Sequence, residues 1–382
     1  MVFTSKDERV VAMQNLLFKG QREELLALLK DRPVVEVAEF HEKQTDDDII
    51  ELLGLFSPEN QGYIFSDFNR KLQLRIFFKM ETRDFAELFS RMPSDDRVDF
   101  YQYLKKEEQE ELLPFLEKKT KQDVLNLSGY RPDTAGGIMN TDFATVLHTM
   151  TMEEALARIR KASPSKKMIY YLYVVDEQMK LLGFITIKNL LMAELEEPIL
   201  HFVNTNFVSA HVEEDQESVA EKIGRYDLVA LPVVNEKGQL VGIVRHDDAL
   251  DIVRREATAD FERFMGIMSE GDTSIRYLDT TAWSHFRKRV VWIVGLAAVG
   301  ILSGVIIHSY EEALDTLRIL ALYMPMMADT GGNVGSQAAT VVVRALALGE
   351  ITARSWFKVI FKEAKVALLI ALCLGVFAYG KV

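Results

Sequence analysis

The spacing of apolar residues changes twice along the chain and divides it into three regions. Up to about residue 130, leucines and phenylalanines recur at steps of three and four among charged residues, which predicts short amphipathic helices. From about 131 to 253, runs rich in β-branched residues alternate with helical patterns, which predicts an α/β region. Beyond about 282, apolar runs at about 290–307, 317–343 and 360–379 predict three membrane helices.

The helical region contains an internal repeat. The segment DIIELLGLF from Asp48 is echoed by DFAELFSRM from Asp84, and a proline and a second helical run follow each copy. Similarity at this period predicts a superhelical stack of helix pairs. The alternative is a coincidental likeness between two amphipathic helices.

The α/β region also repeats. MNTDF at Met139 matches VNTNF at Val203, and YVVDEQMKLLGFITIKNLL at Tyr173 matches PVVNEKGQLVGIVRHDDAL at Pro232. The pattern in each copy predicts a strand, a helix, two strands across a turn and a final helix. That order resembles a tandem pair of CBS domains, which fold together as one regulatory unit.

CBS pairs often bind adenine nucleotides through a Gly-x-x-Ser/Thr-x-x-Asp motif. The first copy keeps the glycine and the hydroxyl but has Asn189 in the acidic place. The second keeps the glycine and Asp248 but has Arg245 in the hydroxyl place. These departures disfavour nucleotide binding, although an adenine nucleotide stays a candidate partner of the pair.

The second apolar run carries polar residues in its middle. Asp329, Asn333, Ser336 or Gln337, and Thr340 recur at steps of three and four, so they share one face of a helix. Polar groups at bilayer depth are costly unless they are satisfied, and an ionisable residue there marks a candidate functional site. We therefore favour an ion path, the alternative being a satisfied polar cluster between packed helices.

Three small or cyclic residues bear on the shape of this helix. Gly331 and Gly335 have the spacing that lets two membrane helices approach closely. Pro325 lacks a backbone donor, so we expect the helix to open locally and to free carbonyl oxygens for an ion.

These residues also carry a family resemblance. The second apolar run resembles the signature membrane helix of the MgtE family of magnesium channels and transporters. The resemblance is carried by Pro325, then GGNVGSQAAT, then RALA from Arg344. The resemblance implies a helical N-domain at 1–130, the CBS pair at 131–253, a connecting helix at 254–281 and an α-helical transmembrane domain at 282–382. It further implies a homodimer in the plasma membrane that carries Mg2+ and is gated by intracellular Mg2+.

The resemblance also assigns residues. The family position of the polar helix implies a pore lined by Asp329, Gly331, Gly332, Asn333, Gln337 and Thr340. Similar positions imply regulatory Mg2+ ligands at Asp95, Asp96, Asp99, Asp227, Asp248, Asp251, Glu256 and Asp260. Screened by Mg2+, these carboxylates would draw the cytoplasmic part together and hold the connecting helix against the pore.

Family members have five membrane helices in each subunit, and this sequence shows three. We expect either a fragment or a truncated relative that needs other chains to conduct. The alternative function is therefore a non-conducting, magnesium-sensing membrane subunit.

The distribution of charge along the sequence bears on the partners of the protein and on its orientation in a membrane. The formal net charge is −12, and because the residues from Val290 onward are nearly balanced, the acidic excess belongs to the region before them. An acidic body argues against nucleic acid as a partner and suits a cation-responsive surface.

Basic residues at 287–289 and again between 344 and 365 flank an acidic loop at 311–315. The positive-inside rule then predicts a multi-pass protein with a cytoplasmic N-terminus in contact with the lipid bilayer.

Enzymatic chemistry is not indicated. The sequence has no phosphate-cradling Gly-Lys loop, no nucleophile–base pairing and no His/Cys metal cluster, and its seven histidines are scattered. Cys373 is the only cysteine and lies in an apolar run. We expect no enzyme activity.

Overall fold

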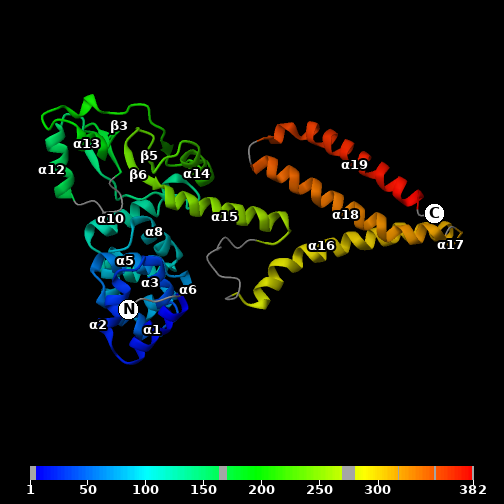
Figure 1. The fold of residues 1–382 in the computed structure, drawn as a ribbon, viewed down its shortest axis with the longest axis horizontal. Coiled ribbons are helices and arrows are strands. Elements are labelled where there is room, and N and C mark those ends of the chain that lie inside the picture. Colours follow the sequence, from blue (N-terminus) through cyan, green and yellow to red (C-terminus); the bar gives the residue numbers. More distant parts are fainter. Residues whose placement is uncertain (1–5, 163–169, 269–279, 317, 348–349, 381–382) are drawn as a thin grey trace. The chain divides into compact units, whose positions relative to one another are not determined.

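The computed structural model of the chain describes residues 6–162, 170–268, 280–316, 318–347 and 350–380. Its contacts divide the chain into two compact units, Met1–Arg289 and Val290–Val382. The first unit contains a helical domain and an α/β pair, and the second contains long helices (Figure 1).

Short helices form the helical domain. They are α1 (Lys6–Phe18), α2 (Arg22–Lys30), α3 (Val34–His41), α4 (Asp46–Leu55), α5 (Pro58–Ser66), α6 (Arg70–Lys79), α7 (Thr82–Ser90), α8 (Ser94–Tyr103), α9 (Lys106–Leu112) and α10 (Lys118–Leu127). From α2 to α7, helices contact the helix two positions further along the chain, as in α3 with α5 and α5 with α7. The stack of short helices expected from the repeat is confirmed.

Local signals in the sequence set where these helices begin. The side chain of Thr45 accepts a hydrogen bond from the backbone N of Asp48 at the start of α4, and Asn69 does the same for Leu72 at the start of α6. Pro58 is the first residue of α5, where its missing N–H is not needed. The two similar sequence segments lie in α4 and α7, each ahead of a proline.

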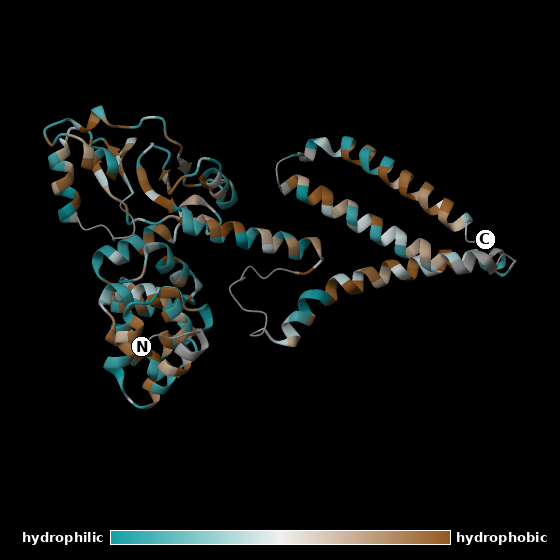
Figure 2. Ribbon diagram, in the orientation of Figure 1, coloured by the Kyte–Doolittle hydropathy of each residue, from teal (hydrophilic) through white to brown (hydrophobic). Residues whose placement is uncertain are grey.

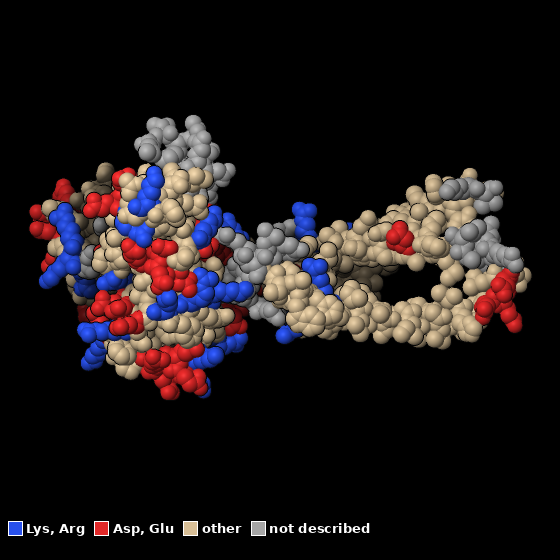
Figure 3. All heavy atoms as spheres, turned by 90° about the horizontal axis from the view of Figure 1, so that it is seen from below, with Lys and Arg blue, Asp and Glu red and all other residues tan. Residues whose placement is uncertain are grey.

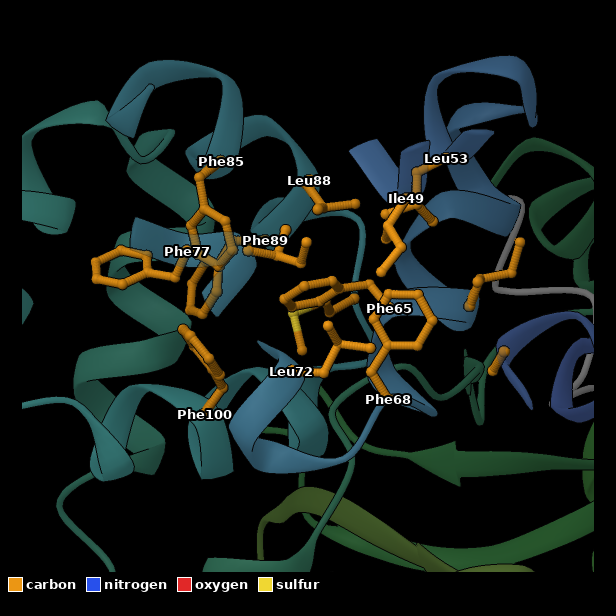
Figure 4. Packing of buried hydrophobic residues seen from close by; sticks show 14 of the residues in the cluster. Ile49, Leu53, Phe65, Phe68, Leu72, Phe77, Phe85, Leu88, Phe89 and Phe100 are labelled. Carbon is orange, nitrogen blue, oxygen red and sulfur yellow. The ribbon is translucent and has the colours of Figure 1, made fainter. Parts of the chain in front are cut away.

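Phenylalanines from four helices fill the centre of this domain (Figure 4). Phe85 lies at ring-centroid distances of 4.9 Å from Phe77 and 5.5 Å from both Phe65 and Phe100, with the Phe65 and Phe77 pairs near edge-to-face. Such pairs add stability beyond the burial of their area. The aromatic core therefore fixes α5, α6, α7 and α8 against one another.

A histidine is buried in the same core. His41 has no exposed surface and lies among the rings of Phe40, Phe56 and Phe68. Its Nδ1 is 2.7 Å from the carbonyl oxygen of Val37, while its Nε2 has no partner. Burial lowers the pKa of His41 to about 4, and the bond to Val37 opposes this shift only in part.

His41 should make the helical domain sensitive to mild acid. Its pKa is lower in the folded than in the unfolded chain, so the unfolded state binds a proton first as the pH falls below about 6.5. We expect the free energy of unfolding of residues 1–268 to fall by about 2 kcal/mol through this group between about pH 7 and about pH 5. Urea titrations should show that His41→Leu removes this part of the dependence, whereas the exposed-site change His246→Gln leaves it. Equal pH dependence in parent and His41→Leu would contradict the assignment.

Two small sheets form the α/β pair. Their elements are β1 (Thr145–Leu147), α12 (Met152–Ala162), β2 (Tyr171–Val175), β3 (Leu181–Thr186) and α13 (Ile187–Met192), then β4 (Ala210–His211), α14 (Gln216–Arg225), β5 (Ala230–Val234), β6 (Leu240–Arg245) and α15 (His246–Phe264). In each sheet the first strand is parallel to the second and the second antiparallel to the third. Val174 pairs with Gly183 as Val233 pairs with Gly242, and both registers shift at the next residue. The tandem repeat read from the sequence is confirmed.

The two repeats are joined by crossed pairing. Asn140, which lies ahead of β1 in the first repeat, exchanges backbone hydrogen bonds of 2.7 and 2.9 Å with Ile243 of β6 in the second. Asn204, which lies ahead of β4 in the second repeat, exchanges bonds of 2.9 and 3.2 Å with Phe184 of β3 in the first. The MNTDF and VNTNF segments therefore bind each repeat to the other.

The crossed pairing gives the two motif glycines a structural role. A Cβ at Gly183 would lie 2.5 Å from the backbone oxygen of Asn204, which cannot move without breaking the pairing. A Cβ at Gly242 would lie 2.5 Å from the Sδ atom of Met139, the end of a flexible side chain.

Alanine at the two glycines should therefore have unequal effects. We expect Gly183→Ala to lower the free energy of unfolding by about 1–3 kcal/mol, because backbone must shift, and Gly242→Ala to lower it by less. Gly224→Ala in α14 is the control, since a Cβ there meets nothing within 4 Å and alanine favours the helix. Urea unfolding of residues 1–268 measures all three, and an equal or larger loss for Gly242→Ala would contradict the crossed-pairing argument.

The last helix of the pair extends beyond the second repeat. α15 is continuous from His246 to Phe264, so the boundary expected between residues 253 and 254 falls inside one helix. No glycine or proline interrupts it, and it ends before Gly266, whose φ of 67° is a conformation that glycine adopts freely. Residues 269–279 of the expected connecting segment lie outside the described residues.

The second unit contains α16 (Ala282–Ser309) from Val290 onward, α17 (Glu311–Thr316), α18 (Arg318–Ala347) and α19 (Trp356–Tyr379). Figure 2 shows α16 as strongly hydrophobic over most of its length and α18 as more polar in its middle. Among the described helices, α16 alone is long and apolar enough by composition to cross a membrane.

α18 continues through Pro325, so the expected local opening is not found there. One missing N–H leaves the neighbouring helical bonds in place.

Candidate functional site

Three sets of side chains carry the candidate chemistry. We call Asp95, Asp96 and Asp99 of α8 with Asp248 of α15 the first acidic group, and Glu217 of α14 with Glu256 and Asp260 of α15 the second acidic group. The polar face is formed by Asp329, Asn333, Gln337 and Thr340 of α18. Charged side chains cover the first unit, whereas few lie along the long helices of the second (Figure 3).

Helix α8 is docked on the second CBS repeat. Val98 is 1% exposed and belongs to the same apolar cluster as Val212 and Ile223 of that repeat. At the start of the helix, the carboxylate of Asp95 accepts a 2.8 Å hydrogen bond from Nδ2 of Asn140. Ser94 Oγ accepts one of 2.8 Å from the backbone N of Thr141. The predicted acidic residues of α8 are thereby brought to the CBS pair.

Arg245 lies at the centre of this contact. Its guanidinium donates to Asp248 from Nε at 2.7 Å and from Nη2 at 2.5 Å, and the same Nη2 lies 3.3 Å from Asp95. The Arg245 side chain is 14% exposed and that of Asp95 is 12% exposed. The sequence identified Arg245 only as a departure from a nucleotide motif, and its role in this contact was missed.

The surroundings disfavour charge on Asp96, Asp248 and Asp142. Burial raises the pKa of Asp96 well above its usual range, and the negative charges of Asp95 and Asp99 add to the effect. Burial also raises the pKa of Asp248 to about 7, against the opposing hydrogen bond from Arg245. Asp142, which follows the crossed pairing and was not predicted, has its pKa raised by burial too. The contact is therefore rich in carboxyl groups that are poorly solvated.

The second acidic group joins α14 to the far half of α15. The carboxylate of Glu256 accepts a 2.7 Å hydrogen bond from Gln216, and Asp260 lies 3.0 Å from the guanidinium of Arg263. The pKa of Glu217 is raised, first by burial and then by the charges of Glu256 and Asp260. Glu217 was not predicted, although it lies in the first turn of a helix that contacts α15.

Two further predicted ligands are exposed. Asp227 follows α14 with a φ of 50°, and Asp251 lies 3.4 Å from the guanidinium of Arg254 on the same helix. Within the described ranges, no three His, Cys, Asp or Glu side chains converge closely enough to hold a metal ion. The predicted regulatory residues therefore form two acidic groups and two separate surface positions.

The ends of the nucleotide motifs have partners within the chain. Thr186 Oγ1 hydrogen-bonds to Oδ1 of Asn189 and accepts a 3.2 Å bond from its backbone N, which caps α13. Asp248 is bound by Arg245. The residues at the ends of both motifs are thus hydrogen-bonded within the chain.

The polar face of α18 is open on this chain. Asp329, Asn333, Gln337 and Thr340 are all exposed, and Thr340 Oγ1 donates to the carbonyl oxygen of Ser336 at 2.8 Å. A Cβ added at Gly331 or Gly332 would meet nothing within 4 Å. This surface is therefore available to water, an ion or another helix.

Comparison with known proteins identifies the family. Residues 32–133 match the MgtE intracellular N domain, 135–196 and 199–255 match the CBS domain, and 324–382 match the divalent cation transporter domain of MgtE. The magnesium transporter MgtE of Bacillus subtilis is 31% identical over 374 residues, which are 98% of this chain and 79% of that protein. The chain belongs to the MgtE family.

Two further MgtE proteins extend the comparison. The magnesium transporter MgtE of Thermus thermophilus is 38% identical over 260 residues, and the match spans 68% of this chain but only 57% of that protein. A crystal structure of the cytosolic domain of the Mg2+ channel MgtE in complex with ATP has a TM-score of 0.59 and 30% identity. It covers 64% of this chain, and 99% of that domain is matched. The helical N-domain and the CBS pair predicted from the sequence are therefore those of an MgtE cytosolic domain.

Proposed function

We propose that the chain carries Mg2+ across the cell membrane as a homodimeric channel or transporter that intracellular Mg2+ regulates. The observation that carries the proposal is the polar face of α18, a line of oxygen-bearing side chains with one carboxylate inside the region matched by the divalent cation transporter domain of MgtE. Transport requires no catalytic group, and we propose no enzyme activity.

The polar face suits a hydrated divalent cation. Mg2+ loses its water reluctantly and is usually held through waters and a few oxygens. Asp329, Asn333 and Gln337 place a carboxylate and two amides one turn apart, and Thr340 adds a hydroxyl. Gly331 and Gly332 leave space beside them, so the helix of a second subunit could approach and double the lining.

The long helices of the second unit are proposed to cross the bilayer. α16 qualifies by its own composition, and α18 and α19 become suitable when their polar residues face protein or water. The basic residues before α16 and between α18 and α19 would then lie in the cytoplasm with the N-terminus. This gives a multi-pass protein of the plasma membrane.

Regulation would act through the acidic groups. Carboxylates that face one another repel, and a bound or screening divalent cation relieves that repulsion. In the second acidic group this would seat α15 on α14, whereas in the first acidic group the guanidinium of Arg245 already lies among the carboxylates. Asp227 and Asp251 are proposed as further ligands at the surface of the same pair. Low Mg2+ would release these contacts and shift the population toward the conducting state.

The second acidic group can be tested by protease protection. We expect millimolar Mg2+ to slow the proteolysis of residues 1–268, because a ligand that binds the compact state stabilises it. Glu217→Gln with Glu256→Gln should reduce the protection by Mg2+ and slow the cleavage in EDTA, since the repulsion is gone. Glu107→Gln with Glu110→Gln on the exposed face of α9 is the matched control. Unchanged protection in the first pair would remove this group from the sensor.

The polar face can be tested by growth. A magnesium-uptake-deficient strain should grow in low Mg2+ when it expresses the chain with any coding sequence that follows Val382. We expect Asn333→Ala to reduce Mg2+ uptake by about tenfold or more, the effect of losing one charge-oriented oxygen ligand. Ala338→Ser, off the Asp329–Asn333–Thr340 face, is the control. Uptake by Asn333→Ala equal to the parent would show that the ion takes another path.

A further inference from the structure

We propose that Arg245 is a built-in cation that holds α8 on the second CBS repeat, so that this contact closes without a bound divalent cation. The inference concerns the conformation of the first unit and does not depend on which ion the chain carries. It makes the first acidic group independent of Mg2+, whereas the second acidic group is proposed to respond to Mg2+.

The backbone fixes Arg245 where a cation is needed. The residue ends β6 and is the N-cap of α15, so its position is set by strand pairing on one side and by the helix on the other. Its side chain reaches back over the first turn of the helix to Asp248 and on to Asp95, which is 150 residues away in the sequence. One guanidinium therefore connects the helical domain with the CBS pair.

The chemistry of the side chain matches the carboxylates around it. A guanidinium offers five donors in a planar fork and stays charged in any protein environment. Here the fork makes a two-donor contact with Asp248, and its Nη1 lies 3.4 Å from Asp247 while Nη2 also faces Asp95. Three carboxylates are thus neutralised in part by a cation that cannot dissociate.

The contact needs this neutralisation. Asp95 and Asp96 lie in the first turn of α8 and are half-buried, whereas Asp99 is exposed, and the apolar packing of Val98 holds this end of the helix against the CBS pair. Removing one partner from a poorly solvated ion pair leaves an uncompensated charge, which costs more than the pair itself contributes. Without Arg245, Asp95 and Asp248 would lose the guanidinium that contacts both of them.

The test measures closure directly. In a Cys373→Ala background, spin labels at Glu107→Cys on α9 and Glu236→Cys in the β5–β6 turn report the distance between the helical domain and the second repeat in the full chain in detergent. We expect the parent to show one short distance in EDTA that millimolar Mg2+ does not change. Arg245→Gln should lose that distance in EDTA, the closed population falling by about tenfold or more, and should regain it in Mg2+.

Two variants separate electrostatics from misfolding. Adding Asp95→Asn to Arg245→Gln removes the uncompensated charge on the α8 side of the contact and keeps a hydrogen-bond acceptor for Asn140, so the short distance should return in EDTA. Arg254→Gln is the matched control, because the Arg254 side chain is 70% exposed and, among the described residues, forms its ion pair with Asp251 on its own helix. A short distance retained by Arg245→Gln in EDTA, a parent that opens in EDTA, or a failure of Asp95→Asn to restore closure would each overturn the proposal.

Discussion

The crossed pairing of the two CBS repeats is the interaction on which the first unit depends. Each repeat has only a three-stranded sheet, and a sheet of that size depends on burying a hydrophobic face. The side chains between the two sheets form a shared core, and Asn140 and Asn204 join the repeats by pairing with a strand of the opposite repeat. The pairing also positions Asn140 beside Asp95, so the docking of α8 follows from the same contact.

The two acidic groups of the first unit differ in how the charge of their carboxylates is compensated. In the first acidic group a fixed guanidinium lies among the carboxylates, whereas in the second the charges of Glu256 and Asp260 act on Glu217. The second group spans two helices of a single repeat and bears on how α15 is held. We therefore infer that a change in Mg2+ concentration would act mainly on α15, the helix that ends the CBS pair.

In the second unit, in contrast to the core of the first, large apolar side chains are exposed. Large apolar side chains along α16 and α19 are exposed, among them Ile301, Leu302, Leu369 and Val376, each more than 60%. An apolar surface of this extent is typical of helices that are covered by lipid or by other helices. The polar face of α18 is exposed in the same unit, and it is the part of that surface which lipid cannot satisfy.

The sequence by itself determined the order of the domains, the tandem repeat and the polar face, because each is written in a local period or a contiguous motif. The 3.6-residue spacing predicts helices, the repeated segments predict two equal folds, and residues one turn apart on one helix must share a face. The resemblance of the sequence to its family added Asp95, Asp96, Asp99 and Asp248 to the candidates.

Only the tertiary structure decided which of these residues meet and what lies between them. Arg245 and Asp95 are 150 positions apart, and their contact exists because the crossed pairing and the packing of Val98 bring α8 to β6. The same is true of Glu217, which acquires its neighbours from the packing of α14 on α15. Contacts of this kind depend on the relative placement of whole elements, and no local pattern along the chain encodes that placement.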